Sequence, residues 1–348
     1  MNTEIVQNNQ NGKDLFFQCV RGICIIAVIL IHCKSGKSYQ GTVSEINFYY
    51  WICLRQIINF AVSVFLFLSG YFVNGENVNK APLDWIRKRF IRLYLPFLVW
   101  ALIYTIVKLH KQLDLSFSSF SRLALGTLTG YYSTHLYYIF ILIQLTLLTP
   151  FLLRKKTARI GFIIICIIFY VCRYLAYFLE LNYFNKIWKF CFPCFGLFYI
   201  LGIEWRHNGL ERIKNIKISF CIIFFVLTLL LSFGESFLLL QLGVDSDFIV
   251  SQVKISSVFF SFSVICFLLK LHTIVSITKS NNLFVIIGNN SFSIYFIHLL
   301  ILYCINMVLK ILNIYDLNVL IIIHIIELSL SLSLLFSLLF KKIRRGNK

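Results

Sequence analysis

Apolar residues run through this chain in long blocks that short polar stretches separate. Ten blocks have about the length that a helix needs to cross the hydrocarbon of a bilayer, roughly 20 residues. Because a backbone in lipid must satisfy its own hydrogen bonds, these blocks are predicted to be α-helices. The ten predicted spans are residues 15–33, 52–73, 91–109, 135–153, 160–180, 188–205, 217–240, 249–271, 286–310 and 318–340.

The composition supports this interpretation. Of the 348 residues, 59% are hydrophobic and 14% are charged, and the mean hydropathy is +0.81. These values are typical of a polytopic membrane protein and exclude a soluble globular domain. The predicted fold class is therefore an all-α polytopic membrane helix bundle. We expect a cytoplasmic tail at 1–14, a transmembrane domain at 15–340 and a basic cytoplasmic tail at 341–348. The first tail has no signal-peptide character, so the first apolar block is expected to be retained.

The net charge of +19 has a simple explanation in the positions of the charges. Lysines and arginines gather in the short loops on the side that the N-terminus shares, as the positive-inside rule requires. This asymmetry predicts that both termini are cytoplasmic, in a multi-pass protein of the cytoplasmic (inner) membrane. Basic loops attract anionic lipid headgroups and phosphate-bearing ligands, so the charge does not indicate a nucleic-acid partner.

The eleven cysteines fall mostly within apolar blocks and lack the spacing of a zinc site. We interpret them as small apolar packing residues. The chain also has no Walker-type phosphate loop, no GxSxG elbow and no HExxH spacing. No metal site is predicted.

The first apolar block carries two ionisable residues, Arg21 and His32. They are eleven positions apart, which on a helix places both on one face, about 16 Å apart along the axis. An ionisable pair inside a membrane helix indicates a polar cavity, and Gly22 beside the arginine agrees with a lined cavity. In the predicted orientation His32 approaches the outer surface. The simpler alternative is an arginine that snorkels inward and a histidine at the outer interface.

Arg89 and Arg92 form an R-x-x-R pair at the start of the third span. Residues at this spacing are neighbours on one helical face, and two guanidinium groups can bind a phosphate bidentately. The alternative is that they only anchor the inner end of a helix. Pro96 is expected to kink this helix or to mark its effective start.

His135 opens the fourth span from the outer side, near the depth of His32. The tyrosines around it suit an aromatic belt at the membrane interface, and equally suit stacking against a sugar ring. They are Tyr131, Tyr132, Tyr137 and Tyr138.

Further polar residues lie in later spans. On the ninth span Ser291, Tyr295 and His298 fall three to four residues apart, and the histidine is either a hydrogen-bonded core residue or a catalytic one. Glu235 is expected near the outer end of the seventh span, where a carboxylate can orient an imidazole. The remaining charged or ionisable residues within spans are Arg55, Arg173, Glu204, His324 and Glu327.

Five stretches of the chain, in this order, resemble the acyltransferase 3 family of bacterial integral-membrane O-acyltransferases, in its membrane-only type. The family pairs an arginine and a histidine eleven positions apart on its first helix. Its later motifs are an LSG-type ending of the second helix, an R-x-x-R before an aromatic-proline helix, a histidine-led fourth helix and a late serine-tyrosine-histidine motif. The matching stretches here are VRGICIIAVILIH, VFLFLSGYFV, RFIRLYLPFLVW, HLYYIFILIQLTLLTP and SFSIYFIH. Tyr137 departs from the family, which more often has tryptophan there.

The resemblance implies transfer of an acyl group, usually acetyl, from cytoplasmic acyl-CoA to a hydroxyl of an extracytoplasmic polysaccharide or lipid-linked sugar. Acetyl-CoA would be the donor, and no metal would be needed. Arg89 and Arg92, with Ser69 from the LSG motif, would bind the donor. The pantetheine arm would follow the Arg21–His32 face, and His32 would act as the base.

Under the same resemblance, the acceptor would meet four residues nearer the outer surface: His135, Tyr138, Glu235 and His298. Two other functions stay open at this point. One is a transporter or exporter of a glycan or small polar solute that uses the same cavity without chemistry. The other is a non-catalytic partner in a glycan-synthesis complex.

Overall fold

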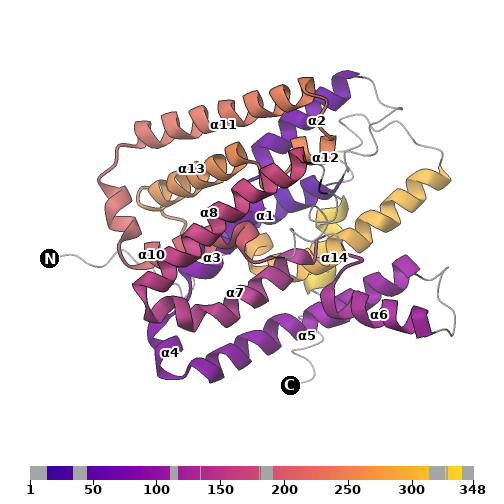
Figure 1. Cartoon of the computed structure of the whole chain (residues 1–348), viewed down its shortest axis with the longest axis horizontal. Helices are drawn as coiled ribbons and strands as arrows, with labels where there is room; N and C mark the ends of the chain where they lie inside the picture. The colour runs from indigo at the N-terminus through magenta and orange to yellow at the C-terminus, as the bar shows by residue number, and fades with distance from the viewer. Residues whose placement is uncertain are drawn as a thin grey trace. The chain divides into compact units, whose positions relative to one another are not determined.

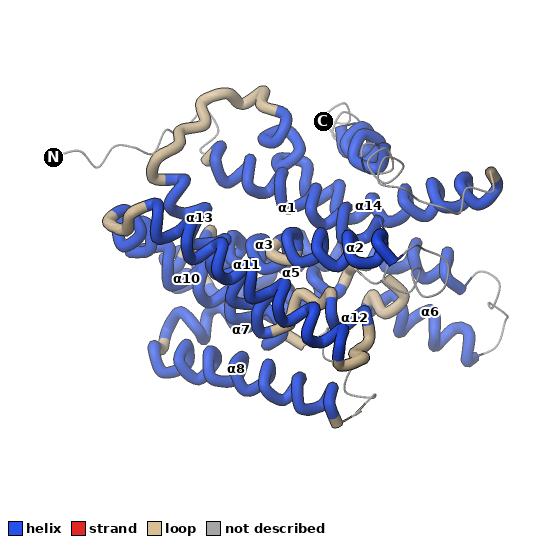
Figure 2. The backbone as a smooth tube through the Cα atoms, turned by 90° about the horizontal axis from the view of Figure 1, so that it is seen from above, coloured by secondary structure: helices blue, strands red, loops and turns tan. Residues whose placement is uncertain are grey.

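The computed structural model describes residues 14–33, 45–109, 117–133, 135–179, 181, 191–312, 326 and 328–338. Within these ranges the regular elements are all helices, and no strand occurs (Figures 1 and 2). The predicted all-α fold class is confirmed. The predicted tails (apart from Asp14), the loop that follows α1, and the residues His324 and Glu327 lie outside the described residues.

Eight helical segments within the described ranges are long and apolar enough to cross a membrane. The chain is thus a multi-pass membrane protein, as its hydropathy predicts. An apolar helix at Leu328–Leu338 is shorter. The eight segments are α1 (Leu15–Cys33), α2–α3 (Phe48–Tyr71), α5 (Pro82–Leu109), α7 (Tyr137–Arg154), α8 (Lys156–Phe178), α11 (Ile218–Gln241), α13 (Ile255–His272) and α14 (Leu283–Ile311).

The span predicted at 52–73 is two helices, α2 (Glu45–Ile58) and α3 (Ala61–Tyr71), with a turn at residues 59–60. The hydropathy pattern gives no sign of this turn, because apolar residues lie on both sides of it. Asn59 at the turn is fully buried, and its amide Nδ2 donates to Ser257 Oγ at 3.5 Å. The break therefore depends on a tertiary contact.

The span predicted at 249–271 starts too early. The short helix α12 (Ser246–Ile249) ends there, and α13 begins only at Ile255. Asp245 starts α12, because its Oδ1 accepts the backbone N–H of Asp247 at 3.3 Å. The residues between the two helices, VSQVK, mix two valines with polar side chains, and their backbone is not helical.

The third predicted span, 91–109, corresponds to a longer helix, α5, that begins at Pro82. Proline is favoured in the first turn of a helix, where its missing N–H costs nothing. Pro96 lies inside α5 and does not mark its start. The basic stretch before Pro96 is helical as well, and the hydropathy pattern detected only the apolar part of the helix.

Further helices lie at the edges of the predicted pattern. The short helix α4 (Gly75–Lys80) and the amphipathic α6 (Phe117–Thr129) were not predicted as helices, and α10 (Pro193–Lys214) continues past the predicted end at 205 through charged residues. All eleven cysteines lie in described positions and are free thiols. Six of them are buried, as the packing interpretation predicts, whereas Cys172 and Cys304 are exposed.

The chain divides into two compact units, unit 1 (residues 1–65 and 207–348) and unit 2 (residues 66–206), and each is described by itself. In unit 1, Asp14 ties the start of α1 to the end of α13. Its Oδ1 accepts the backbone N–H groups of Phe16 and Phe17 at 2.9 and 3.3 Å, and its Oδ2 lies 2.7 Å from His272 Nε2. The ring of Phe17 stacks on His272 with centroids 4.7 Å apart. Asp14 is thus both a helix cap and an ion-pair partner.

In unit 2, two glycines let α3 and α10 touch through their backbones. A Cβ atom on Gly70 would lie 2.1 Å from the carbonyl oxygen of Tyr199, and one on Gly202 would lie 2.1 Å from that of Phe67. Only glycine fits at such a crossing. Gly70 of the LSG motif is therefore a packing residue, and it fixes the place of its neighbour Ser69.

Candidate functional site

The site in unit 1 starts from a second close helix crossing, between α1 and α14. A Cβ atom on Gly22 would lie 2.1 Å from the carbonyl oxygen of Phe284, and one on Gly288 would lie 1.8 Å from that of Gln18. The two backbones are thus in direct contact. Gly22, which the sequence placed in a cavity wall, allows this crossing.

His32 and His298 face one another ten residues beyond these glycines, one on each helix. Their ring centroids lie 5.5 Å apart. The two helices are parallel, and each rises 1.5 Å per residue. Two histidines that each lie ten residues after the crossing glycine of their helix therefore reach the same depth. His298 is fully buried, and His32 is partly buried. The sequence predicted each histidine separately, and the structure brings them together.

The ring of His298 is held by the backbone of its own helix. Its Nδ1 lies 2.7 Å from the carbonyl oxygen of Tyr295 and 3.2 Å from that of Ile294. Carbonyl oxygens only accept hydrogen bonds, so Nδ1 carries the hydrogen. In the neutral ring, Nε2 then carries the lone pair that can accept a proton.

Arg55 of α2 lies at the same end of α1. Its guanidinium donates to the carbonyl oxygen of Ile31, the residue before His32, at 3.1 Å and to that of Val250 at 2.9 Å. The sequence identified Arg55 only as a charge within a span and gave it no role.

Arg21 lies on α1 toward its N-terminal end, partly buried, and its Nη1 donates to Gln18 Oε1 at 3.4 Å. The helical course of α1 confirms that Arg21 and His32 can share a face. The role of Arg21 on the donor side stays a prediction.

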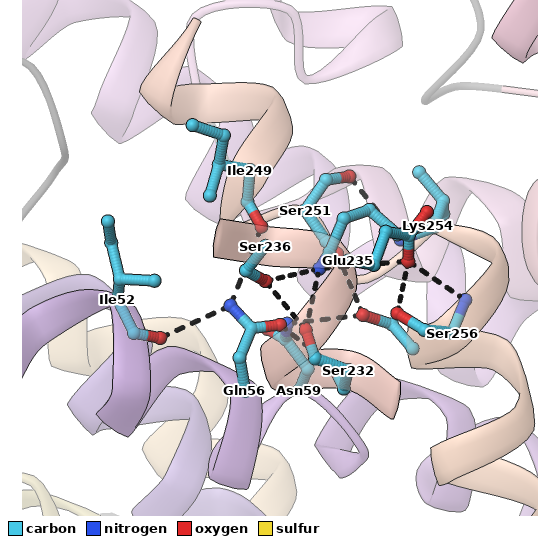
Figure 3. Close-up of polar contacts among 12 residues, drawn as sticks. Ile52, Gln56, Asn59, Ser232, Glu235, Ser236, Ile249, Ser251, Lys254 and Ser256 are labelled. Carbon is cyan, nitrogen blue, oxygen red and sulfur yellow. Dashed lines mark hydrogen bonds and ion pairs between the residues drawn. The ribbon is translucent and has the colours of Figure 1, made fainter. Parts of the chain in front are cut away.

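Glu235 of α11 lies in a buried polar network that Figure 3 shows. Its carboxylate accepts the backbone N–H of Ser256 at 3.1 Å and the hydroxyl of the same serine. It also lies 3.9 Å from Nζ of Lys254, whose side chain is fully buried. The sequence missed Lys254, because a single lysine at a span boundary is normally solvated.

In unit 2, three of the predicted residues form a connected group. Nη2 of Arg89 donates to the carbonyl oxygen of Ser69 at 3.2 Å, and Ser69 Oγ lies 3.5 Å from the hydroxyl of Tyr138. The Arg89 guanidinium carbon lies 5.1 Å from the ring centroid of Trp85. Arg89 is thus held in place by the chain, whereas the side chain of Arg92 is exposed.

His135 is 1% exposed and precedes α7 in a turn. Its ring meets that of Tyr104 edge to face, with centroids 5.0 Å apart. This burial fits a packed core histidine as well as a substrate-binding residue, so its role on the acceptor side stays a prediction.

Comparisons with known proteins agree with the motif order. A family model described as "Acyltransferase domain" matches residues 14–340. The chain is also similar to two proteins named "Nodulation protein NolL". The one from Mesorhizobium japonicum is 26% identical over 215 residues, which cover 59% of this chain and 52% of that protein. The one from Sinorhizobium fredii is 26% identical over 216 residues, which cover 61% and 55%.

The chain spans about half the length of these curated relatives. No solved structure matches it.

Proposed function

Because this chain belongs to the acyltransferase 3 family, we propose that it is a membrane O-acyltransferase. The proposed donor is cytoplasmic acyl-CoA, with acetyl-CoA as the first choice. The proposed acceptor is a hydroxyl of an extracytoplasmic polysaccharide or lipid-linked sugar, reached from the outer face of the cytoplasmic membrane.

The observation that carries this proposal is the pair of facing imidazoles, His32 and His298. In the proposed reaction, the oxygen of the acceptor hydroxyl attacks the carbonyl carbon of the thioester. A C–O bond forms, the C–S bond breaks, and the hydroxyl proton passes through the imidazole to the leaving thiolate. The neutral imidazole of histidine carries a lone pair that can accept the hydroxyl proton, as a general base must.

The two histidines have different roles in this proposal. His32 is the base, because it lies on the helix that also carries Arg21 and is partly exposed. His298 has a ring orientation that backbone carbonyls fix, and it positions the acceptor hydroxyl. His135, Tyr138 and Glu235 are proposed acceptor-side residues.

Donor binding is proposed for the R-x-x-R pair. Arg92 and Arg89 would bind the phosphates of CoA, since guanidinium groups form bidentate, charge-assisted bonds to phosphate. Ser69 takes part through its backbone carbonyl, which accepts from Arg89. Arg21 would line the path of the pantetheine arm.

Mass spectrometry of surface glycans from cells with and without this protein tests the proposal. We expect ester-linked acyl groups to disappear from one glycan when the protein is absent. If the glycan keeps its esters but fails to reach the cell surface, the protein is an exporter and the proposal is wrong.

A further inference from the structure

The C-terminal end of α1 carries the base of the proposed reaction, and Arg55 is bound directly to it. The last four carbonyls of an α-helix have no partner within the helix, and that of Ile31 is one of them. Arg55 Nη1 donates to this oxygen at 3.1 Å. The guanidinium thus caps α1 at the residue next to His32.

The second donor of Arg55 caps another helix. Its Nη2 lies 2.9 Å from the carbonyl oxygen of Val250, the C-cap residue of α12. The planar guanidinium has its donors in a fixed fork, whereas a lysine ammonium is a point charge on a flexible stem. The fork therefore sets the distance between the end of α1 and the end of α12. The ring of Trp51, which is 2% exposed, lies 5.7 Å from the guanidinium carbon and covers it.

The carbonyl oxygen of Val250 can hold Arg55 in place only if the backbone around it is itself fixed. The segment 250–254 is fixed at both of its ends. Irregular backbone at membrane depth occurs only where protein buries it or it lines a cavity, and Val253 and Lys254 are buried. At the first end, Gln56 Nε2 lies 3.5 Å from the carbonyl oxygen of Ile249.

At the second end, Lys254 Nζ donates to Ser236 Oγ at 2.6 Å and lies 3.9 Å from Glu235. The network closes through α11, because Ser232 Oγ donates to Gln56 Oε1 at 2.9 Å. These contacts can be followed in Figure 3. The segment is therefore held to α2 and α11 by contacts of Gln56 and Lys254, neither of which has a role in the proposed chemistry.

We propose that Arg55 is a positioning residue for His32: it fixes the end of α1 against the anchored segment 250–254 so that the His32 ring stays opposed to that of His298. The inference rests on the proposed function, because positioning matters only if His32 acts as the base. In this proposal Arg55 acts through His32 and does not itself contact the substrate.

Steady-state kinetics of Arg55→Gln and Arg55→Lys test the proposal. Misplacing a reacting group by about 1 Å can cost about 100-fold in rate. We expect kcat of Arg55→Gln to fall about 10- to 100-fold, with the KM for acyl-CoA changed less than about twofold. Arg55→Lys should recover part of the loss. Arg122→Gln is the matched control. Among the described residues, this exposed arginine has its hydrogen bonds within its own helix, to Ser118 and Ser119, so the variant should keep its activity.

A second measurement needs no activity. With His32→Cys and His298→Cys combined, a short bifunctional thiosulfonate reagent should join positions 32 and 298, and peptide mass spectrometry identifies the linked pair despite the native cysteines. We expect the link to form severalfold more slowly when Arg55→Gln is added. If Arg55→Gln does not fold, Arg55→Lys serves in both measurements.

An unchanged linking rate overturns the positioning role, and so does an unchanged kcat in a folded Arg55 variant. Absence of acyl transfer by the wild-type protein would refute the proposed function instead, and the linking rate would still decide whether Arg55 sets the geometry.

Discussion

The crossing of α1 and α14 leaves no room for a side chain at two positions, and this gives a quantitative prediction. In Gly288→Ala the new Cβ would lie 1.8 Å from the Gln18 carbonyl oxygen, where ordinary contact needs at least 3.4 Å. The helices must therefore move apart by about 1.6 Å at that point. For Gly22→Ala the corresponding distance is 2.1 Å, to the Phe284 carbonyl oxygen, and the required movement is about 1.3 Å. Overpacking of this kind costs about 1–3 kcal/mol, occasionally more.

Gly234→Ala is the matched control. Gly234 lies within α11 of the same unit, and a Cβ there meets nothing within 4 Å. Alanine in a helix interior is favoured over glycine by about 0.5–1 kcal/mol, so this variant should be as stable as the wild type or more stable. The same substitution of glycine by alanine is thus predicted to lower the stability at Gly22 and Gly288 and to keep or raise it at Gly234.

Thermal unfolding followed with a thiol-reactive dye can measure the difference. The chain has eleven free cysteines, several of them buried, and these react as the bundle opens. We expect Gly22→Ala and Gly288→Ala to unfold at lower temperature than the wild type, and Gly234→Ala to unfold at the same temperature or higher. If all three variants melt together with the wild type, the close crossing of α1 and α14 is wrong.

Three further predictions follow. Asp14→Ala should cost about 0.5–2 kcal/mol of stability through loss of the α1 cap. Burial opposes ionisation of Asp14, yet the hydrogen bond and charge of His272 and the N–H groups of Phe17 and Phe16 hold its pKa below the usual 3.8. The contribution of Asp14 to the free energy of unfolding should therefore be present above about pH 4 and be lost as the pH falls further. Denaturation curves at several pH values would detect this loss. Arg92→Ala should weaken acyl-CoA binding about 10- to 150-fold, since a hydrogen bond to a charged group contributes roughly 1.5–3 kcal/mol, and equilibrium binding with unchanged affinity would return Arg92 to the role of a topological anchor. A cysteine at Ser38 should react with an impermeant reagent in intact cells, and reaction at Asn77 instead would reverse the predicted orientation.

Much of the helical course could be predicted from the sequence, because a membrane helix has to carry a long apolar block. What hydropathy could not supply was where a helix breaks inside such a block. The turn at residues 59–60 depends on a contact with Ser257. The irregular segment 250–254 depends on contacts with Gln56 and Ser236, which belong to other helices. The amphipathic α6 was missed because it is too short to span a membrane.

The site was predicted as separate residues and not as a constellation. His32 and His298 were both identified, but their pairing depends on the register of two parallel helices, which the Gly22–Gly288 crossing sets. The equal ten-residue offset from glycine to histidine was present in the sequence and, with the crossing known, identifies the pair. The role of Arg55 could not be read from the sequence, because its partners are backbone carbonyls, which carry no sequence signal.

The most direct test of the proposed acyl transfer uses labelled acetyl-CoA and membrane vesicles that contain the acceptor glycan. Wild-type protein should move the label into an ester on the glycan. His32→Ala, which should still insert and still bind the donor, should lose about 10²–10⁴ in rate. Transfer by His32→Ala at near the wild-type rate would contradict the role of His32 as the base, and a wild-type protein that leaves the glycan unlabelled would contradict acyl transfer itself.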